Sequence, residues 1–261
     1  MTRVAGVVRK LRWSVAQRGV GGTLRFALGR VGARGDREPK VHPFDLQHGV
    51  ETSGLIGGAD LATGHVHDVY NTAYYGMSPS RFRAAMELWV SLPPLAPVES
   101  YTFVDLGSGK GRAVLMASQL PFVEVIGVEL HPELAAAAVR NWETWQSAGK
   151  NVVSARFVCG DATKFEFPSG PCLLYLFNPF GRPVVERLLE RIAVSFPDRP
   201  GLLDVVYFNP EAGGAFEEHG GFERLWSGTL ELSAEDAAAD LVASPDDLCN
   251  LYRWVGVPER A

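Results

Sequence analysis

The sequence predicts an α/β fold in which helices cover both faces of an open, mostly parallel sheet. Short apolar runs alternate with segments of helical periodicity between residues 101 and 208, which is the pattern of repeated strand–helix units. The first run, 101–106, ends in a glycine-rich turn that opens a helix. Polar residues follow several of the runs, at the strand ends where ligands bind in such sheets. We therefore expect a ligand site along the carboxyl edge of the sheet.

The predicted core begins with a helix that Ser78-Pro79-Ser80 starts and Pro93-Pro94 ends, because proline suits the first turn of a helix but cannot continue one. Strands are then expected at 101–106, 122–128, 152–158, 172–177 and 202–208, and helices at 110–119, 132–146 and 182–195. A weak helix at 211–219, a strand at 222–232, an acidic connector at 234–241 and a last strand at 250–255 follow. The sequence thus predicts seven strands.

The 261 residues carry a net charge of −5, which is unevenly distributed. Residues 1–40 contain ten Lys/Arg and two Asp/Glu, whereas the remaining residues contain 15 and 28. The acidic body argues against a general nucleic-acid binder. The basic N-terminus either contacts an anionic surface weakly or is a solvated extension. Three cysteines without a C-x-x-C pair, and no apolar run of 18 residues, predict a reduced, cytoplasmic protein.

We expect three parts: a basic extension at 1–40, a cap segment at 41–78 that acts as a lid, and the main domain at 79–261. The cap segment has little periodicity but many aromatic residues, which favours a functional loop over disorder. Tyr70, Tyr74, Tyr75 and Asn71 of this segment are expected to face the ligand site. The alternative is that the tyrosines only anchor the loop.

Four of the six histidines lie in the cap segment, among them His65 and His67. Two histidines at this spacing point to one side of an extended segment, so a metal site is one interpretation. No cysteine lies nearby in the sequence, and ordinary hydrogen-bonding histidines are the alternative. We expect no metal.

Gly107, Gly109 and Gly111 form a G-x-G-x-G turn directly after the first predicted strand. Such glycines let a ligand lie against the backbone, but dinucleotide sites use G-x-G-x-x-G. Asp105, two residues before the turn, would repel a pyrophosphate and suits an ammonium group. The turn therefore argues against a nicotinamide or flavin site.

The segment Phe-Val-Asp-Leu-Gly-Ser-Gly-Lys-Gly-Arg (103–112) resembles the first motif of the class I S-adenosylmethionine (SAM) methyltransferases. The similarity extends over about residues 70–210, with acidic residues after the next two predicted strands. It implies a Rossmann-like, seven-stranded sheet that ends in an antiparallel hairpin. It also implies SAM as cofactor and S-adenosylhomocysteine (SAH) as product.

The resemblance implies roles for individual residues. Asp105 would hold the methionine ammonium, Glu129 the ribose and Asp161 the adenine. The expected cofactor-binding residues are Tyr74, Asp105, Gly107, Ser108, Gly109, Gly111, Arg112, Glu129, Leu130, Asp161, Ala162 and Asn178.

Asn178-Pro179-Phe180 follows the fourth predicted strand of the core, where the family keeps its catalytic motif. It resembles the Asn/Asp-Pro-Pro-Tyr/Phe signature of amino-group methyltransferases, with one proline fewer. The combination of motifs is similar to a group of small bacterial class I methyltransferases and, in part, to the non-SET histone-lysine methyltransferases. The Asn side chain and the backbone around Pro179 can accept hydrogen bonds from an N–H group, and Phe180 can face a cation.

We expect these three residues and Tyr75 to be catalytic. The predicted function is SAM-dependent N-methylation of an amine on a small molecule, a peptide or a protein lysine. Two alternatives stay open: an O-methyltransferase of a small metabolite, and a SAM- or SAH-binding module without catalysis.

Overall fold

The computed structural model describes residues 41–240, 243–244 and 246–257. The predicted basic extension at 1–40 lies outside the described residues. The described residues form one compact unit, so the cap segment belongs to the same unit as the main domain. Within the described ranges, no helix is long and apolar enough to cross a membrane.

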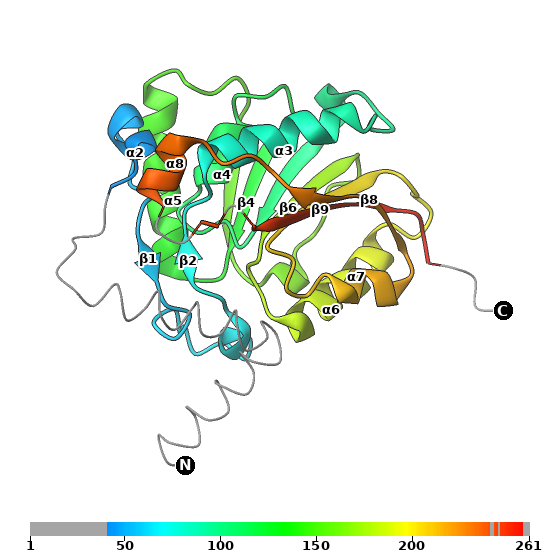
Figure 1. Ribbon diagram of the computed structural model, residues 1–261. Coiled ribbons are helices and arrows are strands. Elements are labelled where there is room, and N and C mark those ends of the chain that lie inside the picture. The colour runs from blue at the N-terminus through cyan, green and yellow to red at the C-terminus, as the bar shows by residue number, and fades with distance from the viewer. Residues whose placement is uncertain (1–40, 241–242, 245, 258–261) are drawn as a thin grey trace, which may run out of the picture. The chain divides into compact units, whose positions relative to one another are not determined.

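A seven-stranded sheet forms the centre of this unit (Figure 1). Its strands are β3 (Thr102–Leu106), β4 (Val125–Glu129), β5 (Ala155–Cys159), β6 (Cys172–Phe177), β7 (Leu203–Phe208), β8 (Phe222–Thr229) and β9 (Leu248–Trp254). The order across the sheet is β5-β4-β3-β6-β7-β9-β8, with β9 antiparallel to both of its neighbours. This is the Rossmann-like sheet of the class I methyltransferase fold, and it confirms the predicted fold class and the closing hairpin.

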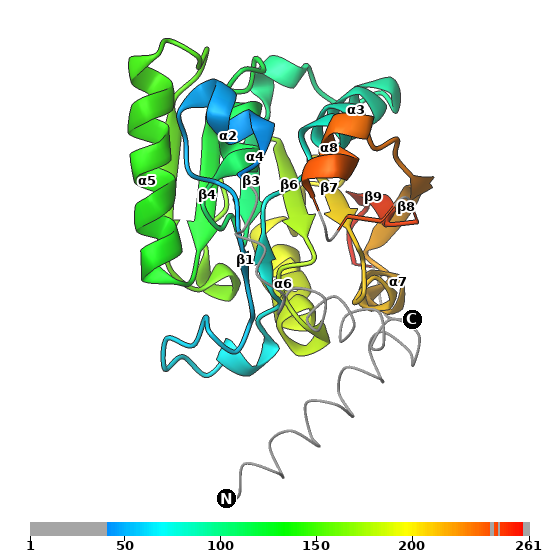
Figure 2. The same ribbon diagram turned by 60° about the vertical axis from the view of Figure 1, so that its left-hand side comes forward.

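Helices cover both faces of the sheet, as Figure 2 shows. On one face, α3 (Pro79–Ser91), α4 (Arg112–Ala117) and α5 (Pro132–Ser147) share an apolar core with the strands. On the other face, α6 (Arg182–Ser195) and α7 (Gly214–His219) form the second core. The middle strands are buried on both faces, which is why they appear in the sequence as continuous apolar runs.

The ends of the predicted elements shift by a few residues. The second and third predicted strands begin three residues later than expected, at Val125 and Ala155, and the helix after the glycine turn is limited to Arg112–Ala117. One prediction is wrong in kind: the acidic connector contains a helix, α8 (Ala234–Ala239). The Ser233 side chain accepts a hydrogen bond from the Asp236 amide, which caps this helix.

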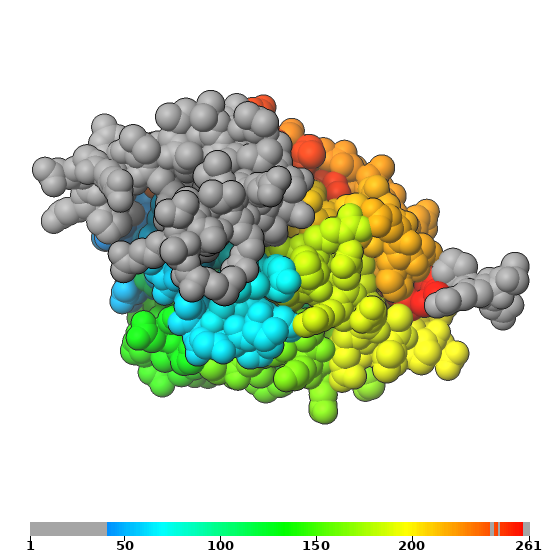
Figure 3. Space-filling model, turned by 90° about the horizontal axis from the view of Figure 1, so that it is seen from below, coloured from blue at the N-terminus to red at the C-terminus, as the bar shows by residue number. Residues whose placement is uncertain are grey.

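The cap segment contains more regular structure than its sequence suggests. It holds α2 (Pro43–His48), the 3₁₀ turn η1 (Asp68–Tyr70) and a two-stranded ladder of β1 (Leu55–Ile56) and β2 (Tyr74–Tyr75). In Figure 3 the cyan surface of this segment lies against the yellow-green surface of α6. The elements are short and depend on contacts distant in sequence, so periodicity does not reveal them.

Candidate cofactor and acceptor site

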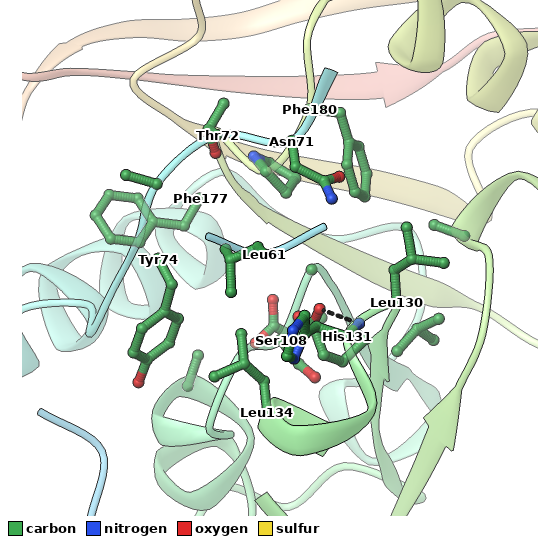
Figure 4. A pocket seen from close by; sticks show the side chains of 18 of the residues that line it. Leu61, Asn71, Thr72, Tyr74, Ser108, Leu130, His131, Leu134, Phe177 and Phe180 are labelled. Carbon is green, nitrogen blue, oxygen red and sulfur yellow. Dashed lines mark hydrogen bonds between the residues drawn. The ribbon is translucent and has the colours of Figure 1, made fainter. Parts of the chain in front are cut away.

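A pocket lies at the carboxyl ends of β3 to β6, under residues 61–77 of the cap segment. Figure 4 shows Asn71 and Phe180 on one side of it, with Ser108, His131 and Leu134 on the opposite side. The predicted site residues among its lining are Tyr74, Tyr75, Asp105, Gly107, Ser108, Arg112, Glu129, Leu130, Asp161, Ala162, Pro179 and Phe180. The structure therefore brings most of the predicted site residues together; Gly109, Gly111 and Asn178 lie outside the lining.

Two neighbouring segments lie very close to the backbone of the glycine turn. Gly107 and Gly109 have left-handed φ angles of +81° and +54°. A Cβ atom on Gly107 would lie 2.4 Å from Cβ of Pro179, and one on Gly109 would lie 2.3 Å from the ring of Tyr74. The first two glycines are thus required by contacts within the protein, because the 178–180 loop and the cap segment both press against the turn.

Asp105 is the most unusual side chain of the site. It is 3% exposed, and no hydrogen-bond donor or cation of the described residues meets its carboxylate. Burial, and then the neighbouring Glu129 carboxylate, raise its pKa well above the usual value. An ammonium group in the pocket would supply the missing counter-charge.

Glu129 ends β4 and points its carboxylate at the glycine turn. Its Oε2 accepts a hydrogen bond from the Gly109 amide at 2.8 Å, and its Oε1 accepts one from the His131 amide at 2.8 Å. Burial raises the pKa of Glu129, and these bonds offset part of the effect. Each carboxylate oxygen can accept a second bond, so a ligand hydroxyl can still bind here.

Asp161 follows β5 and caps the 3₁₀ turn η3 (Ala162–Lys164). Its Oδ1 accepts bonds from the amide and the hydroxyl of Thr163, at 2.9 and 2.8 Å, whereas the buried Oδ2 has no hydrogen-bond partner among the described residues. Burial would raise the pKa of Asp161, but the Thr163 bonds and the nearby His67 and His65 lower it below its usual value. The carboxylate is therefore ionised, with one free oxygen.

Arg112, predicted to bind the cofactor, is engaged by the cap segment. Its guanidinium donates hydrogen bonds to the Thr52 hydroxyl at 2.6 Å and to the Met77 carbonyl at 3.1 Å, and it lies 3.5 Å from the buried Asp45 carboxylate. The side chain is 4% exposed. Arg112 thus ties the cap segment to the glycine turn, and its cofactor role stays a prediction.

Of the three tyrosines expected to face the site, Tyr74 and Tyr75 line the pocket, whereas Tyr70 lies outside the lining and packs against the core that contains α6. The Tyr74 hydroxyl donates to the Thr52 carbonyl at 2.7 Å. The Tyr75 hydroxyl accepts a bond from the Asn209 side chain at 3.2 Å, and its ring packs edge-on against Phe177 at 4.7 Å between centroids. Burial raises the pKa of Tyr75, so the phenol remains a neutral donor.

The 178–180 loop is shared between the cap segment and the pocket. Asn178 has a left-handed φ of +41°, and its buried Oδ1 is unpartnered within the described residues. Thr72 occupies the main-chain oxygens: its hydroxyl donates to the Asn178 carbonyl at 2.6 Å, and its amide to the Pro179 carbonyl at 3.4 Å. Of the acceptors predicted for an N–H group, the Asn178 side chain has no partner among the described residues, whereas the Asn178 and Pro179 carbonyls each already accept one bond from Thr72.

Sequence reasoning missed several residues of the site. Leu61, Thr72, Leu134 and Tyr175 line the pocket. His67 was singled out for its spacing to His65, but its place between Asp161 and Arg187 of α6 was not predicted. Tyr175 was included in a core strand, but the register places it beside Asp105. That pairing follows from the strand alignment, so a register prediction would have found it.

His65, His67 and Asp161 form a cluster of residue types that can bind a metal ion, as the histidine spacing suggested. Each offers one ligand atom, and these atoms lie within 4.8 Å of one another.

No protein-family model and no curated protein matches the chain. Similar solved structures include a SAM-dependent methyltransferase from Clostridium acetobutylicum, with 10% identity, a TM-score of 0.48, and coverage of 69% of this chain and 93% of that one. An RNA methyltransferase from Salinibacter ruber in complex with SAH has 23% identity, a TM-score of 0.41 and coverage of 67% and 93%. The [4+2]-cyclase SpnF has 15% identity, a TM-score of 0.45 and coverage of 67% and 81%. One fold hosts many activities, so a likeness of this kind assigns none.

Proposed function

We propose that this protein is a SAM-dependent methyltransferase that acts on an amine of a small molecule, a peptide or a protein lysine. The observation that carries the proposal is the convergence of three carboxylates, on Asp105, Glu129 and Asp161, on one pocket at the ends of neighbouring strands. Two of them keep free acceptor capacity in a buried place, because Asp105 has no partner and Asp161 keeps Oδ2 free among the described residues. Buried polar groups require partners.

The functional groups of SAM match these acceptors. Asp105 suits the ammonium group of the methionine part, Glu129 the ribose hydroxyls and Asp161 Oδ2 the adenine amino group. An acidic pocket also suits the positive charge of the sulfonium. These three carboxylates therefore fit SAM, which when bound supplies an electrophilic methyl group.

The residues of the chain have two tasks in methyl transfer, alignment of the acceptor and exclusion of water. Asn178 itself lies outside the pocket lining, but its neighbours Pro179 and Phe180 line the pocket. For an amine bound against this loop, the free Oδ1 of Asn178 would accept an N–H, which leaves the nitrogen lone pair to point at the methyl group. Phe180, at 8% exposure, presents an aromatic face to the developing cation. The cap segment covers the pocket and limits access of water. An amine needs only its lone pair, which is why we favour N-methylation.

Transfer of tritium from methyl-labelled SAM to a panel of amines, including lysine peptides, tests this function. Asn178→Gly removes the side chain without a backbone penalty at φ +41°, so it should lose at least about a hundredfold in turnover and keep its SAM affinity. Asn178→Asp keeps an acceptor oxygen and should retain part of the activity. Equal turnover in Asn178→Gly and wild type would refute the role of Asn178. SAM binding without transfer to any amine or hydroxyl compound would favour the binding module.

A further inference from the structure

Two histidines of the cap segment face the carboxylate at the end of β5. Nε2 of His65 lies 3.7 Å from Oδ2 of Asp161, and Nδ1 of His67 lies 3.5 Å from Oδ1. The His67 and Asp161 side chains are 7% and 9% exposed. Of this histidine pair, His65 and His67, His67 lines the pocket beside Asp161, whereas His65 lies next to it, outside the lining, with its ring 4.9 Å from that of His67.

Hydrogen bonds on the far side of each ring fix where the imidazole protons lie. The His67 amide donates to Nδ1 of His65 at 3.2 Å, so a neutral His65 carries its proton on Nε2. Arg187 of α6 approaches Nε2 of His67 at 2.5 Å, and a guanidinium can only donate. A neutral His67 therefore carries its proton on Nδ1. Both rings present an N–H, not a lone pair, to Asp161.

This arrangement argues against a metal at the cluster. A metal binds the lone pair of a neutral imidazole, and here the lone pairs point at Arg187 and at the His67 amide. Loading a metal between the rings and Asp161 would require both tautomers to change and would set the protonated Nε2 of His67 against a guanidinium. Two N–H groups facing a carboxylate instead stabilise its ionised form.

We propose that the histidine pair is a positioning element of the nucleoside subsite, and this rests on the proposed function. Asp161 Oδ1 is occupied by Thr163, while Oδ2 is buried without a hydrogen-bond partner in the described chain. Arg187 fixes the His67 ring, and the two imidazole N–H groups orient the carboxylate, so that Oδ2 accepts the exocyclic amino group of adenine. The cap segment thereby selects adenine over 6-oxopurines.

The cap segment is held rigidly around the histidine pair. The Asp68 carboxylate accepts bonds from the Thr63 hydroxyl and from the Thr63 and Gly64 amides, at 2.7 to 3.0 Å. On the other side, the Gly181 amide donates to the Tyr70 carbonyl at 2.8 Å. The pair is therefore presented by a turn anchored at both ends, as a positioning element requires.

Calorimetric titrations of SAH and of its 6-oxo analogue, S-inosylhomocysteine, test the inference. The ratio of the two dissociation constants is the readout, because a general loss of folding does not change purine selectivity. The variants are His67→Gln, which can still donate to Asp161 and accept from Arg187, and His67→Phe, which can do neither. His48→Gln, in the same cap segment but bonded to Lys150, is the matched control.

Wild type and His48→Gln should favour SAH over the inosine compound by at least about tenfold. His67→Phe should lose most of that preference, and His67→Gln should keep it within about twofold. An unchanged ratio in His67→Phe, or equal loss in both His67 variants, would overturn the proposal. So would micromolar binding of Zn²⁺ alone that disappears in His67→Phe, since it would place lone pairs towards Asp161. Failure of wild type to bind SAH at all would refute the proposed function instead.

Discussion

The contact between the glycine turn and the 178–180 loop predicts a specific effect of Gly107→Ala. The new methyl group would lie 2.4 Å from Cβ of Pro179, which is far inside van der Waals contact, so the loop or the turn must move. Gly107 also has φ +81°, where a non-glycine residue costs about 1–2 kcal/mol. Overpacking of this kind typically adds about 1–3 kcal/mol. We expect a total loss of about 2–5 kcal/mol in the free energy of unfolding.

Gly149→Ala is the matched control for this substitution. Gly149 has a similar φ of +64°, but a Cβ there meets nothing within 4 Å. It should therefore show only the backbone cost of about 1–2 kcal/mol. Urea unfolding of both variants, followed by tryptophan fluorescence, gives the difference directly. Equal losses within about 0.5 kcal/mol would refute the claim that the 178–180 loop presses on Gly107.

Three further predictions concern the cap segment and the acids of the pocket. Arg112→Met should cost about 3–5 kcal/mol in urea unfolding, because it leaves the Asp45 carboxylate buried without its counter-charge; a loss below about 1 kcal/mol would contradict the pairing. Tyr75→Phe should cost about 1 kcal/mol through the lost Asn209 bond, and unchanged stability would mean that this bond contributes nothing. Burial raises the pKa of Asp105, so the native state holds the proton more tightly than the unfolded state, and this contribution to stability is lost as pH rises above about 4. Asp105→Asn should therefore raise the melting temperature at pH 7 and make it less dependent on pH, while SAM binding weakens. A lower melting temperature of the variant at pH 7 would contradict the claim that the ionised Asp105 carboxylate destabilises the native state.

The central sheet could be predicted from sequence because its strands are buried on both faces. Runs such as 172–177 must be apolar along their whole length, and the glycine turn after Leu106 marks the first crossover. The same logic placed Asp105, Glu129 and Asp161 at one edge of the sheet, since the carboxyl ends of parallel strands meet there.

The cap segment could not be predicted in the same way, because long-range polar contacts determine its structure. Thr72 is positioned by the carbonyls of the 178–180 loop, and Asp45 by Arg112. His67 depends on Arg187 from α6, which is 120 residues away. None of these pairs has a periodic signature, so the sequence showed only that the segment is rich in polar and aromatic groups. The helix α8 was missed for a similar reason, because its sequence is acidic and short and it is held by Ser80 of α3.

The most direct test of the account is calorimetric titration of SAH into wild type, Glu129→Ala and Glu133→Ala. Glu133, in the first turn of α5 and exposed, is the charge-matched control. We predict a 1:1 complex of micromolar affinity for wild type and Glu133→Ala, and a loss of at least about tenfold for Glu129→Ala. Absence of binding to wild type, or equal affinity in Glu129→Ala, would contradict the claim that the carboxylates at the strand ends form a SAM site.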